Sequence, residues 1–283
     1  MLKQRQPAVS LGTTAAVLFL VMSADVIGQL PTEMANRRRA HGGDVAPVYE
    51  GWEPNKDGTV TMYFGYFNRN YEEHVDIPIG PNNSFDPAPA DRGQPTYFYV
   101  NRHKKGLAIV VPATTKTLTW TLSRDGVHMN KVVGTVDPPY QIDATKAEGN
   151  EGPKVNAGPG QVISFPQTAT LTGTITDDGL PKAPSTRVGD DGKPLNAGPR
   201  GVRFNWRKYR GPGTVTFSTS AGETKDDKAV TTAKFSEPGV YWLQLIADDG
   251  TAGGVLDENG SPGANLCCSS SDVVVVTVKP AGQ

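Results

Sequence analysis

The chain has 283 residues, a formal net charge of −1, 32 glycines and 23 prolines. Glycine and proline exceed ordinary usage but stay below the share of about 25–30% that is typical of low-complexity disorder, so a turn-rich globular protein is predicted. The near-zero charge argues against a nucleic-acid binder, which would carry a basic face. Two cysteines are too few for a dense disulfide framework.

Residues 1–28 are typical of a secretory signal peptide. Lys3 and Arg5 precede an uncharged, mainly apolar stretch at residues 8–24, and small residues follow it. Asp25 interrupts the apolar run, which favours cleavage near residue 24 or 28 over an uncleaved membrane anchor. We therefore expect a secreted, periplasmic or cell-surface protein with no stable membrane insertion after signal cleavage.

The next part of the chain predicts a flexible arm followed by a β domain. Residues 29–45 are polar and include three consecutive arginines, which is typical of a solvated arm. Residues 46–140 are predicted to form a β-sandwich with a proline-rich loop at residues 80–95. Its expected strands, rich in β-branched and aromatic residues, are 48–52, 59–67, 97–100, 107–111, 118–122 and 131–136.

A second β domain is predicted after a glycine-, asparagine- and proline-rich linker at residues 141–152. Seven short strands with turn residues between them indicate a two-sheet sandwich over residues 153–283. They are 161–165, 169–176, 202–208, 214–218, 229–235, 240–248 and 272–279. The predicted fold class is therefore all-β, with two β-sandwich domains in tandem after the signal segment.

Four segments of the second domain resemble the PKD-like, immunoglobulin-like modules of bacterial secreted and surface proteins. They occur in order at residues 156–160, 169–181, 211–217 and 233–250. The resemblance covers about residues 153–279 and departs from the family by insertions at about 182–200 and 251–271. It implies an immunoglobulin-type sandwich that acts as a non-catalytic spacer or adhesive unit. The first domain carries no comparable resemblance.

The second domain also contains a candidate calcium site. In an immunoglobulin-type sandwich, the loops after strands B and F emerge at the same end. Each of these loops begins here with Asp-Asp-Gly, which places Asp177 and Asp178 near Asp248 and Asp249. Calcium takes six to eight oxygen ligands, mainly carboxylates and carbonyls, so these four aspartates are candidate ligands.

Two other interpretations of the acidic pole stay open. Asp-Asp-Gly is a good turn sequence by itself, because Asp bonds its own backbone and Gly allows positive φ. Long loops at one end of a sandwich also form protein-binding surfaces. The insertions add further acids to this pole, namely Asp190, Asp191, Asp257 and Glu258.

An aromatic strand in the first domain is a candidate glycan-binding element. Alternation along the strand places Tyr63 and Phe67 on one face and Phe64 and Tyr66 on the other. One face must belong to the core, and the other is free to stack on sugar rings, so Tyr63 and Tyr66 are candidate ligand-binding residues. The alternative is that sheets or loops cover both faces.

These patterns favour a non-catalytic function in extracellular binding, adhesion or structural presentation. The sequence lacks Gly-x-Ser-x-Gly, His-Glu-x-x-His and phosphate-loop motifs, so we expect no enzyme. The expected partner is an extracellular protein or glycan, and self-association into a homo-oligomer stays open. The alternatives are a carbohydrate-binding module and a hydrolase with a dispersed site. The adjacent Cys267 and Cys268 allow a vicinal disulfide, free thiols or an intermolecular link.

Overall fold

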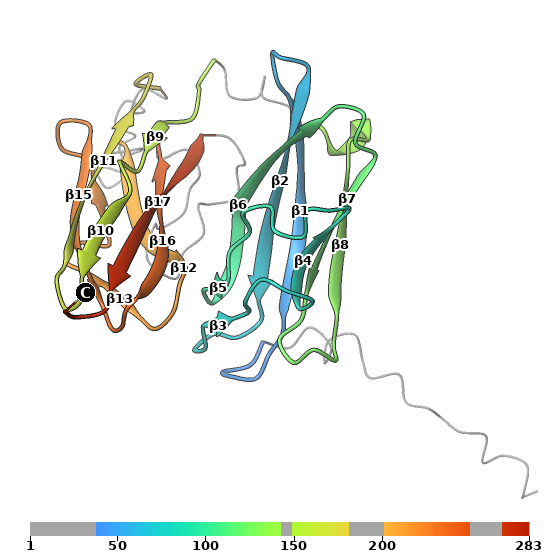
Figure 1. Cartoon of the computed structure of the whole chain (residues 1–283). Coiled ribbons are helices and arrows are strands. Elements are labelled where there is room, and N and C mark those ends of the chain that lie inside the picture. Colours follow the sequence, from blue (N-terminus) through green and yellow to red (C-terminus); the bar gives the residue numbers. More distant parts are fainter. Residues whose placement is uncertain (1–37, 143–148, 181–200, 250–267, 283) are drawn as a thin grey trace, which may run out of the picture. The chain divides into compact units, whose positions relative to one another are not determined.

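The computed structural model describes residues 38–142, 149–180, 201–249 and 268–282, and these residues belong to one compact unit, residues 38–283. Their regular elements are almost entirely β-strands, which confirms the predicted all-β class (Figure 1). The predicted signal peptide and most of both insertions lie outside the described residues. Within the described ranges, no helix has the length and apolar character needed to cross a membrane.

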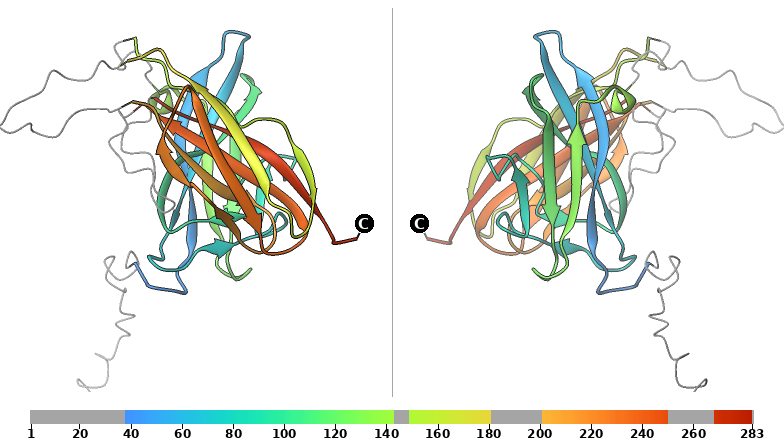
Figure 2. Two further views of the ribbon diagram at one scale, coloured as in Figure 1. Left: turned by 90° about the vertical axis from the view of Figure 1, so that its left-hand side faces the viewer. Right: turned by 90° about the vertical axis from the view of Figure 1, so that its right-hand side faces the viewer.

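The N-terminal strands form a sandwich of two three-stranded sheets, with strand orders β1-β2-β6 and β4-β7-β8 (Figures 1 and 2). A small two-stranded sheet, β3-β5, is added to them. The strands are β1 (Val45–Pro54), β2 (Thr59–Asn68), β3 (Val75–Asp76), β4 (Asn83–Asp86), β5 (Tyr97–Phe98), β6 (Asn101–Pro112), β7 (Thr117–Leu122) and β8 (Asn130–Thr135).

The core of this first sandwich lies between the two main sheets. On β7 the alternating Leu118, Trp120 and Leu122 are fully buried, as expected for a strand with one face in the core. Trp120 stacks on Phe85 and meets Phe64 of the opposite sheet edge to face. These aromatic contacts join the two layers, and aromatic side chains contribute most of the apolar area buried in such a core.

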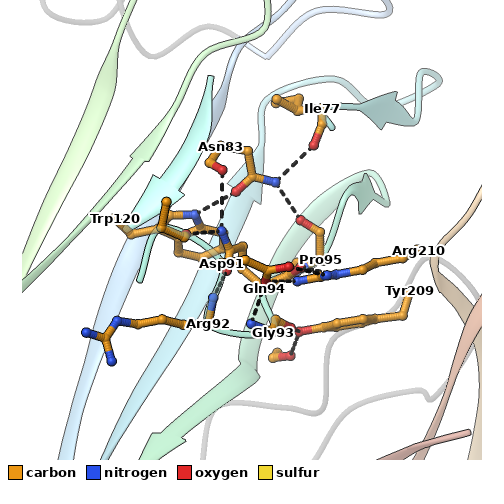
Figure 3. A network of polar contacts seen from close by, with 12 residues as sticks. Ile77, Asn83, Asp91, Arg92, Gly93, Gln94, Pro95, Trp120, Tyr209 and Arg210 are labelled. Carbon is orange, nitrogen blue, oxygen red and sulfur yellow. Dashed lines mark hydrogen bonds and ion pairs between the residues drawn. The ribbon is translucent and has the colours of Figure 1, made fainter. Parts of the chain in front are cut away.

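A strand forms inside the segment that was predicted as the proline-rich loop. β4 pairs with β7, and the buried amide of Asn83 connects it to the rest of the loop (Figure 3). The Asn83 Nδ2 atom donates to the carbonyls of Ile77 at 2.9 Å and Pro95 at 2.8 Å, and its Oδ1 atom accepts from the Trp120 indole at 3.0 Å. The Asn83 side chain therefore supplies hydrogen-bond partners to these buried polar groups, which the backbone of the short loop does not supply.

The C-terminal strands form a second sandwich with a five-stranded and a four-stranded sheet. Their strand orders are β10-β17-β16-β12-β14 and β13-β15-β11-β9. The strands are β9 (Lys154–Asn156), β10 (Gln161–Ser164), β11 (Ala169–Thr176), β12 (Arg203–Arg210), β13 (Val215–Phe217), β14 (Ala221–Glu223), β15 (Lys228–Phe235), β16 (Gly239–Asp248) and β17 (Ser269–Lys279).

The topology of this second sandwich is of the immunoglobulin type. The first strand is split between the sheets, because β9 pairs antiparallel with β11 while β10 pairs parallel with β17. Trp206 on β12 is fully buried, at the place of the core tryptophan on strand C of immunoglobulin domains. The hydroxyl of Tyr241, near the start of β16, donates to the Glu237 carbonyl at 2.7 Å, which is the tyrosine-corner contact of this fold.

All seven strands predicted for the second domain are present, and the sequence missed β9 and β14. Each of the missed strands has only three residues, too few for a visible alternation of polar and apolar side chains. The position two residues after Tyr241, where antibody domains carry a disulfide cysteine, holds the buried Leu243. Apolar packing therefore joins the two layers at this point.

The end of the predicted flexible arm is ordered on the first sandwich. Arg39 forms a bridge with Asn70, and the Arg39 amide donates to the Arg69 carbonyl at 3.0 Å. The buried Gly43 donates its amide to the Asn70 side chain at 2.6 Å. The sequence did not indicate this order, because the partners on β2 and beyond are distant along the chain.

Asn83 provides a test of the loop architecture. We expect Asn83→Ala to lower the free energy of unfolding by about 3 kcal/mol, because the two carbonyls and the Trp120 indole lose buried partners. Urea denaturation measures this change. The neighbouring Asn82→Ala is the control and should stay within about 0.5 kcal/mol. Equal effects of the two substitutions would contradict the assigned role of Asn83.

Candidate functional site

Two buried cations of the described chain, Arg207 and Lys208, lie where β12 meets the first sandwich. Six consecutive residues of β12, from Phe204 to Tyr209, are buried, although the strand contains four cationic side chains. One face of β12 packs into the core of its own sandwich through Trp206. The other face contacts the first sandwich through polar side chains, and we call this contact region the junction.

Arg207 lies at the centre of the junction. Its Nη1 atom donates to Nδ1 of His103 at 2.9 Å, and its Nε atom donates to Oε1 of Gln244 at 2.9 Å. The guanidinium also lies over the ring of Tyr99, with 5.7 Å between its carbon and the ring centroid. Arg207 is only 4% exposed, and these three partners are neutral side chains that provide oriented dipoles and a π face.

The protonation state of His103 follows from its two contacts. Its Nε2 atom lies 2.8 Å from the Val100 carbonyl, which can only accept, so Nε2 carries the proton and Nδ1 accepts from Arg207. His103 is fully buried, and this burial, together with the charge of Arg207, lowers its pKa to about 3. A neutral imidazole is therefore part of the folded junction.

Lys208 also contacts partners in both sandwiches. Its Nζ atom donates to the carbonyls of Gly213 at 2.6 Å and Gly211 at 3.2 Å. It also lies 3.6 Å from Oδ2 of Asp76 and 3.9 Å from the ring centroid of Tyr97 in the first sandwich. Burial lowers the pKa of Lys208 and raises the pKa of Asp76, because removal from water disfavours the charged form of each group.

Tyr209 and Arg210 dock on the proline-rich loop of the first sandwich (Figure 3). The Tyr209 hydroxyl donates to the Gly93 carbonyl at 2.8 Å. Arg210 forms a bidentate pair with Asp91 at 2.6 and 3.0 Å, and its Nε atom donates to the Gln94 carbonyl at 2.7 Å. The hydrogen bonds from Arg210 hold the pKa of Asp91 below its usual value.

The docking loop is fixed from within by a buried glutamine. The Gln94 side chain accepts from the Arg92 amide at 2.7 Å and donates to the Ala90 carbonyl at 2.9 Å and the Asn83 carbonyl at 3.3 Å. Figure 3 shows this network joining the Asn83 contacts to the docked Arg210. The loop therefore presents its carbonyls and Asp91 to the second sandwich in a fixed geometry.

A small pocket of about 150 Å³ opens at the junction. His74, Tyr97 and Tyr99 line it from the first sandwich, and Trp206, Lys208 and Phe217 are among its lining residues from the second. The His74 Nδ1 atom lies 2.8 Å from the Tyr97 hydroxyl. This contact pairs two polar groups of the pocket with each other, and the pocket is much smaller than the roughly 300–1,000 Å³ of typical ligand sites.

Tyr63 and Tyr66, the two candidate ligand-binding residues, differ in how deeply they are buried. Tyr66 is buried, and its ring stacks on His103 with centroids 4.8 Å apart, so no face of Tyr66 is available to a sugar. Burial raises the pKa of Tyr66 to about 12. Tyr63 is half-buried, its hydroxyl donates to Glu53 at 2.8 Å, and Lys105 lies 4.6 Å from its ring centroid. Glycan binding by Tyr63 stays a prediction.

The four candidate calcium ligands each have protein partners. Asp248 is buried and pairs with Arg203 at 3.2 Å, and Asp249 accepts from the Asn150 amide at 2.7 Å. Asp177 accepts from the Gly179 amide at 3.0 Å, and Asp178 accepts from the Glu151 amide at 2.9 Å. Burial raises the pKa of Asp177, and the neighbouring Asp178 and Asp249 raise it further.

The loops after β11 and β16 bring three of the four candidate aspartates together. Asp177, Asp178 and Asp249 lie close enough to interact electrostatically, as expected from the two loops. Among the described residues, no group of three or more His, Cys, Asp or Glu side chains has the arrangement that would hold a metal ion. The acids of the insertions lie outside the described ranges, so calcium binding stays a prediction.

Cys268 is disulfide-bonded, which excludes the free-thiol alternative for this residue in the structure. The sequence contains only one other cysteine, Cys267, which lies outside the described residues.

Comparisons with known proteins add little to this site. No family model matches the chain, and no curated protein matches it. Domains 4 and 5 of the S-layer protein SbsC match with 15% sequence identity and a TM-score of 0.25, covering 83% of this chain and 98% of that chain. The IG1 and IG2 domains of DIP-gamma match with 12% identity and a TM-score of 0.23, again covering 83% and 98%. Likeness at this level carries no argument, and the immunoglobulin-type assignment rests on strand order, Trp206 and Tyr241.

The neutral His103 predicts a specific pH dependence of stability. Its pKa of about 3 in the folded state lies below the ordinary value of 6.5, so the unfolded state binds the proton first. Its contribution is therefore complete above pH 6.5 and is lost as the pH falls from 6.5 toward 3, by about 1.4 kcal/mol per pH unit.

His103→Gln tests this contribution, because the glutamine amide oxygen can still accept from Arg207 but does not titrate. Urea denaturation from pH 7.5 down to pH 4.5 measures both proteins. We expect the wild type to lose about 2–3 kcal/mol more than the variant over this range. Parallel profiles for the two proteins would show that His103 is not neutral and buried in the folded state.

Proposed function

We propose that the chain is a secreted or surface-associated, non-catalytic protein that acts in extracellular binding, adhesion or structural presentation. In this proposal the second sandwich is a PKD-like module that holds the first sandwich in a fixed orientation. The junction carries the proposal, because Arg207, Lys208 and Arg210 each contact fixed partners in the first sandwich. A rigid pair of sandwiches is suited to presenting loops at a distance from a surface.

The chemistry of the junction supports structure over catalysis. A general acid or base needs access to substrate and a pKa near the working pH. His103 is fully buried with a pKa far below that range, and the ammonium group of Lys208 is held by two carbonyls and Asp76. These titratable groups act as docking groups between the sandwiches.

The extracellular location rests on the sequence. An apolar stretch after Lys3 and Arg5, followed by small residues, is typical of a secretory signal. A secreted chain with two rigid β-sandwiches fits a role in presenting loops outside the cell better than a role inside the cell. Burial of Tyr66 removes half of the proposed aromatic platform, which makes a carbohydrate-binding module the weaker alternative.

The orientation of the sandwiches provides the structural test. Residual dipolar couplings of residues 29–283 should fit one alignment tensor for both sandwiches. In the double variant Tyr209→Phe/Arg210→Ala the contacts to Gly93, Gln94 and Asp91 are lost, at a cost of about 1–2 kcal/mol, and we expect two tensors. Lys234→Ala, an exposed cation on β15, is the control and should keep one tensor. Two tensors in the wild type would overturn the rigid-presentation model.

Binding provides the functional test. The wild type, the double variant and the Lys234→Ala control are passed over immobilised extracellular matrix proteins, polysaccharides and intact bacterial envelopes. We expect the wild type and the control to be retained on at least one surface, and the double variant to be retained less on the same surface. Turnover of polysaccharide or peptide substrates by the wild type, with no retention on any surface, would favour the hydrolase alternative.

A further inference from the structure

The contact between His103 and Arg207 crosses the junction and depends on the protonation state of the imidazole. His103 lies on β6 of the first sandwich, and Arg207 lies on β12 of the second. The Nδ1 atom of His103 accepts from the guanidinium at 2.9 Å, and the guanidinium has no lone pair with which it could accept in return. A proton on Nδ1 would set two donors and two positive charges against each other in a buried site. The docked arrangement therefore requires a neutral imidazole.

The charged groups near His103 oppose a proton on it. Arg207 faces the imidazole from the second sandwich, and Arg102 precedes it on β6. Both charges lower the pKa of His103, and His74 of the first sandwich lowers it further when it is protonated. The carboxylate of Glu50 is paired with Arg102 at 2.5 Å. An imidazolium at this position would therefore meet like charge from both sandwiches.

The other groups around the imidazole are neutral. The Tyr66 ring stacks on His103 with centroids 4.8 Å apart, and the Tyr99 ring lies 6.1 Å away. Burial raises the pKa of both hydroxyls far above neutrality, so neither of them supplies a negative charge. Gln244 reaches the junction from β16 with an uncharged amide. None of these described neighbours compensates a second buried cation beside Arg207.

We infer that His103 makes the docking of the two sandwiches sensitive to acid, so that a proton on its imidazole releases the second sandwich from the first. Release exposes His103 and Arg207 to water, where both can carry charge without facing each other. Each sandwich has its own buried core, around Trp120 in the first and Trp206 in the second, so each can stay folded after release. This acid response goes beyond the presentation role proposed above, and it rests on the docked arrangement that the role requires.

The size of the response follows from proton linkage. The pKa of His103 is about 3 in the docked state and returns to its ordinary value of 6.5 when the imidazole is exposed to water. Below pH 6.5 the released state therefore binds more protons than the docked state. The ratio of released to docked molecules then rises about tenfold per pH unit, which gives about a hundredfold rise between pH 7.5 and pH 4.5.

The two aspartates of the junction do not produce the same response in this pH range. The hydrogen bonds from Arg210 hold the pKa of Asp91 below its usual value, so Asp91 stays ionised down to pH 4.5. Burial raises the pKa of Asp76 in the docked state, so through Asp76 acid favours docking over release. A variant of His103 therefore separates the contribution of the imidazole from the contributions of both carboxylates.

Hydrogen exchange of two backbone amides measures the release directly. The Lys208 amide donates to the Tyr99 hydroxyl at 2.9 Å, and the Thr96 amide donates to the Tyr209 carbonyl at 3.1 Å. Both hydrogen bonds cross the junction, so their protection from exchange reports the ratio of docked to released molecules. Exchange is followed by NMR on residues 29–283 between pH 7.5 and pH 4.5, and the rates are corrected for the intrinsic effect of pH on amide exchange.

We expect the protection of both junction amides to fall about a hundredfold from pH 7.5 to pH 4.5 in the wild type. In His103→Gln we expect no fall, because glutamine does not titrate while its amide oxygen can still accept from Arg207. His128→Gln is the matched control and should keep the fall of the wild type. His128 is exposed and pairs with Asp125 inside the first sandwich, away from the junction.

Amides of the central strands β2 and β16, such as those of Met62 and Leu243, show whether each sandwich stays folded. We expect them to keep their protection at pH 4.5. A fall of equal size in the wild type and in His103→Gln would overturn the inference, and so would a joint loss of protection at the junction and in the central strands. Junction amides that are unprotected already at pH 7.5 would instead contradict the docked arrangement and with it the proposed function.

Arg207→Gln tests the other partner of the contact and leaves the imidazole unchanged. A glutamine amide can donate to a neutral His103 or accept from a protonated one, and it carries no opposing charge. We therefore expect a smaller fall in protection between pH 7.5 and pH 4.5 than in the wild type. An unchanged fall would contradict the role assigned to the charge of Arg207.

Discussion

The burial of the Arg207 guanidinium is the constraint on which the arrangement of the two sandwiches depends. A charge taken out of water costs several kcal/mol unless oriented groups replace its hydration. β12 brings Arg207 to the outer face of its sheet, and its own sandwich supplies Gln244. The other partners, Tyr99 and His103, come from the first sandwich. The second sandwich therefore completes the solvation of its own buried cation only when the first is docked.

This dependence extends from Arg207 into the proline-rich loop. Arg210 docks on Asp91 and the Gln94 carbonyl, so the loop must hold these groups in place. It does so through Gln94 and Asn83, whose amides pair with backbone groups inside the loop (Figure 3). The core tryptophan Trp120 in turn donates to Asn83. A continuous set of hydrogen bonds thus connects the core of the first sandwich to the surface of the second.

The same arrangement gives the buried polar groups of the junction a structural role. The cations of β12 and the neutral imidazole of His103 are used within the junction, where they stabilise the docking of one sandwich on the other. Rigid sheets that carry loops at their ends fit a protein that binds or presents, which is the function proposed above.

The sequence by itself determined the all-β class and most strands, because both depend on local patterns. Alternation at Leu118, Trp120 and Leu122 and turn residues between short runs are visible without any tertiary partner. The expected closeness of Asp177 and Asp249 also followed, since strand order in an immunoglobulin-type sandwich fixes which loops share an end. The three-residue strands β9 and β14 were missed because they are too short to show a period.

Only the tertiary structure decided which polar residues are buried. Charged residues such as Arg207 and Lys208 are typical of a solvated strand face. Their burial depends on contacts with the first sandwich, more than 90 positions away in the sequence. From the sequence, Tyr66 was a candidate for ligand binding as well as for the core, and its contact with His103 places it inside. Local patterns specify strands, whereas the partner that covers each strand face comes from distant residues, so the junction could not be found from the sequence.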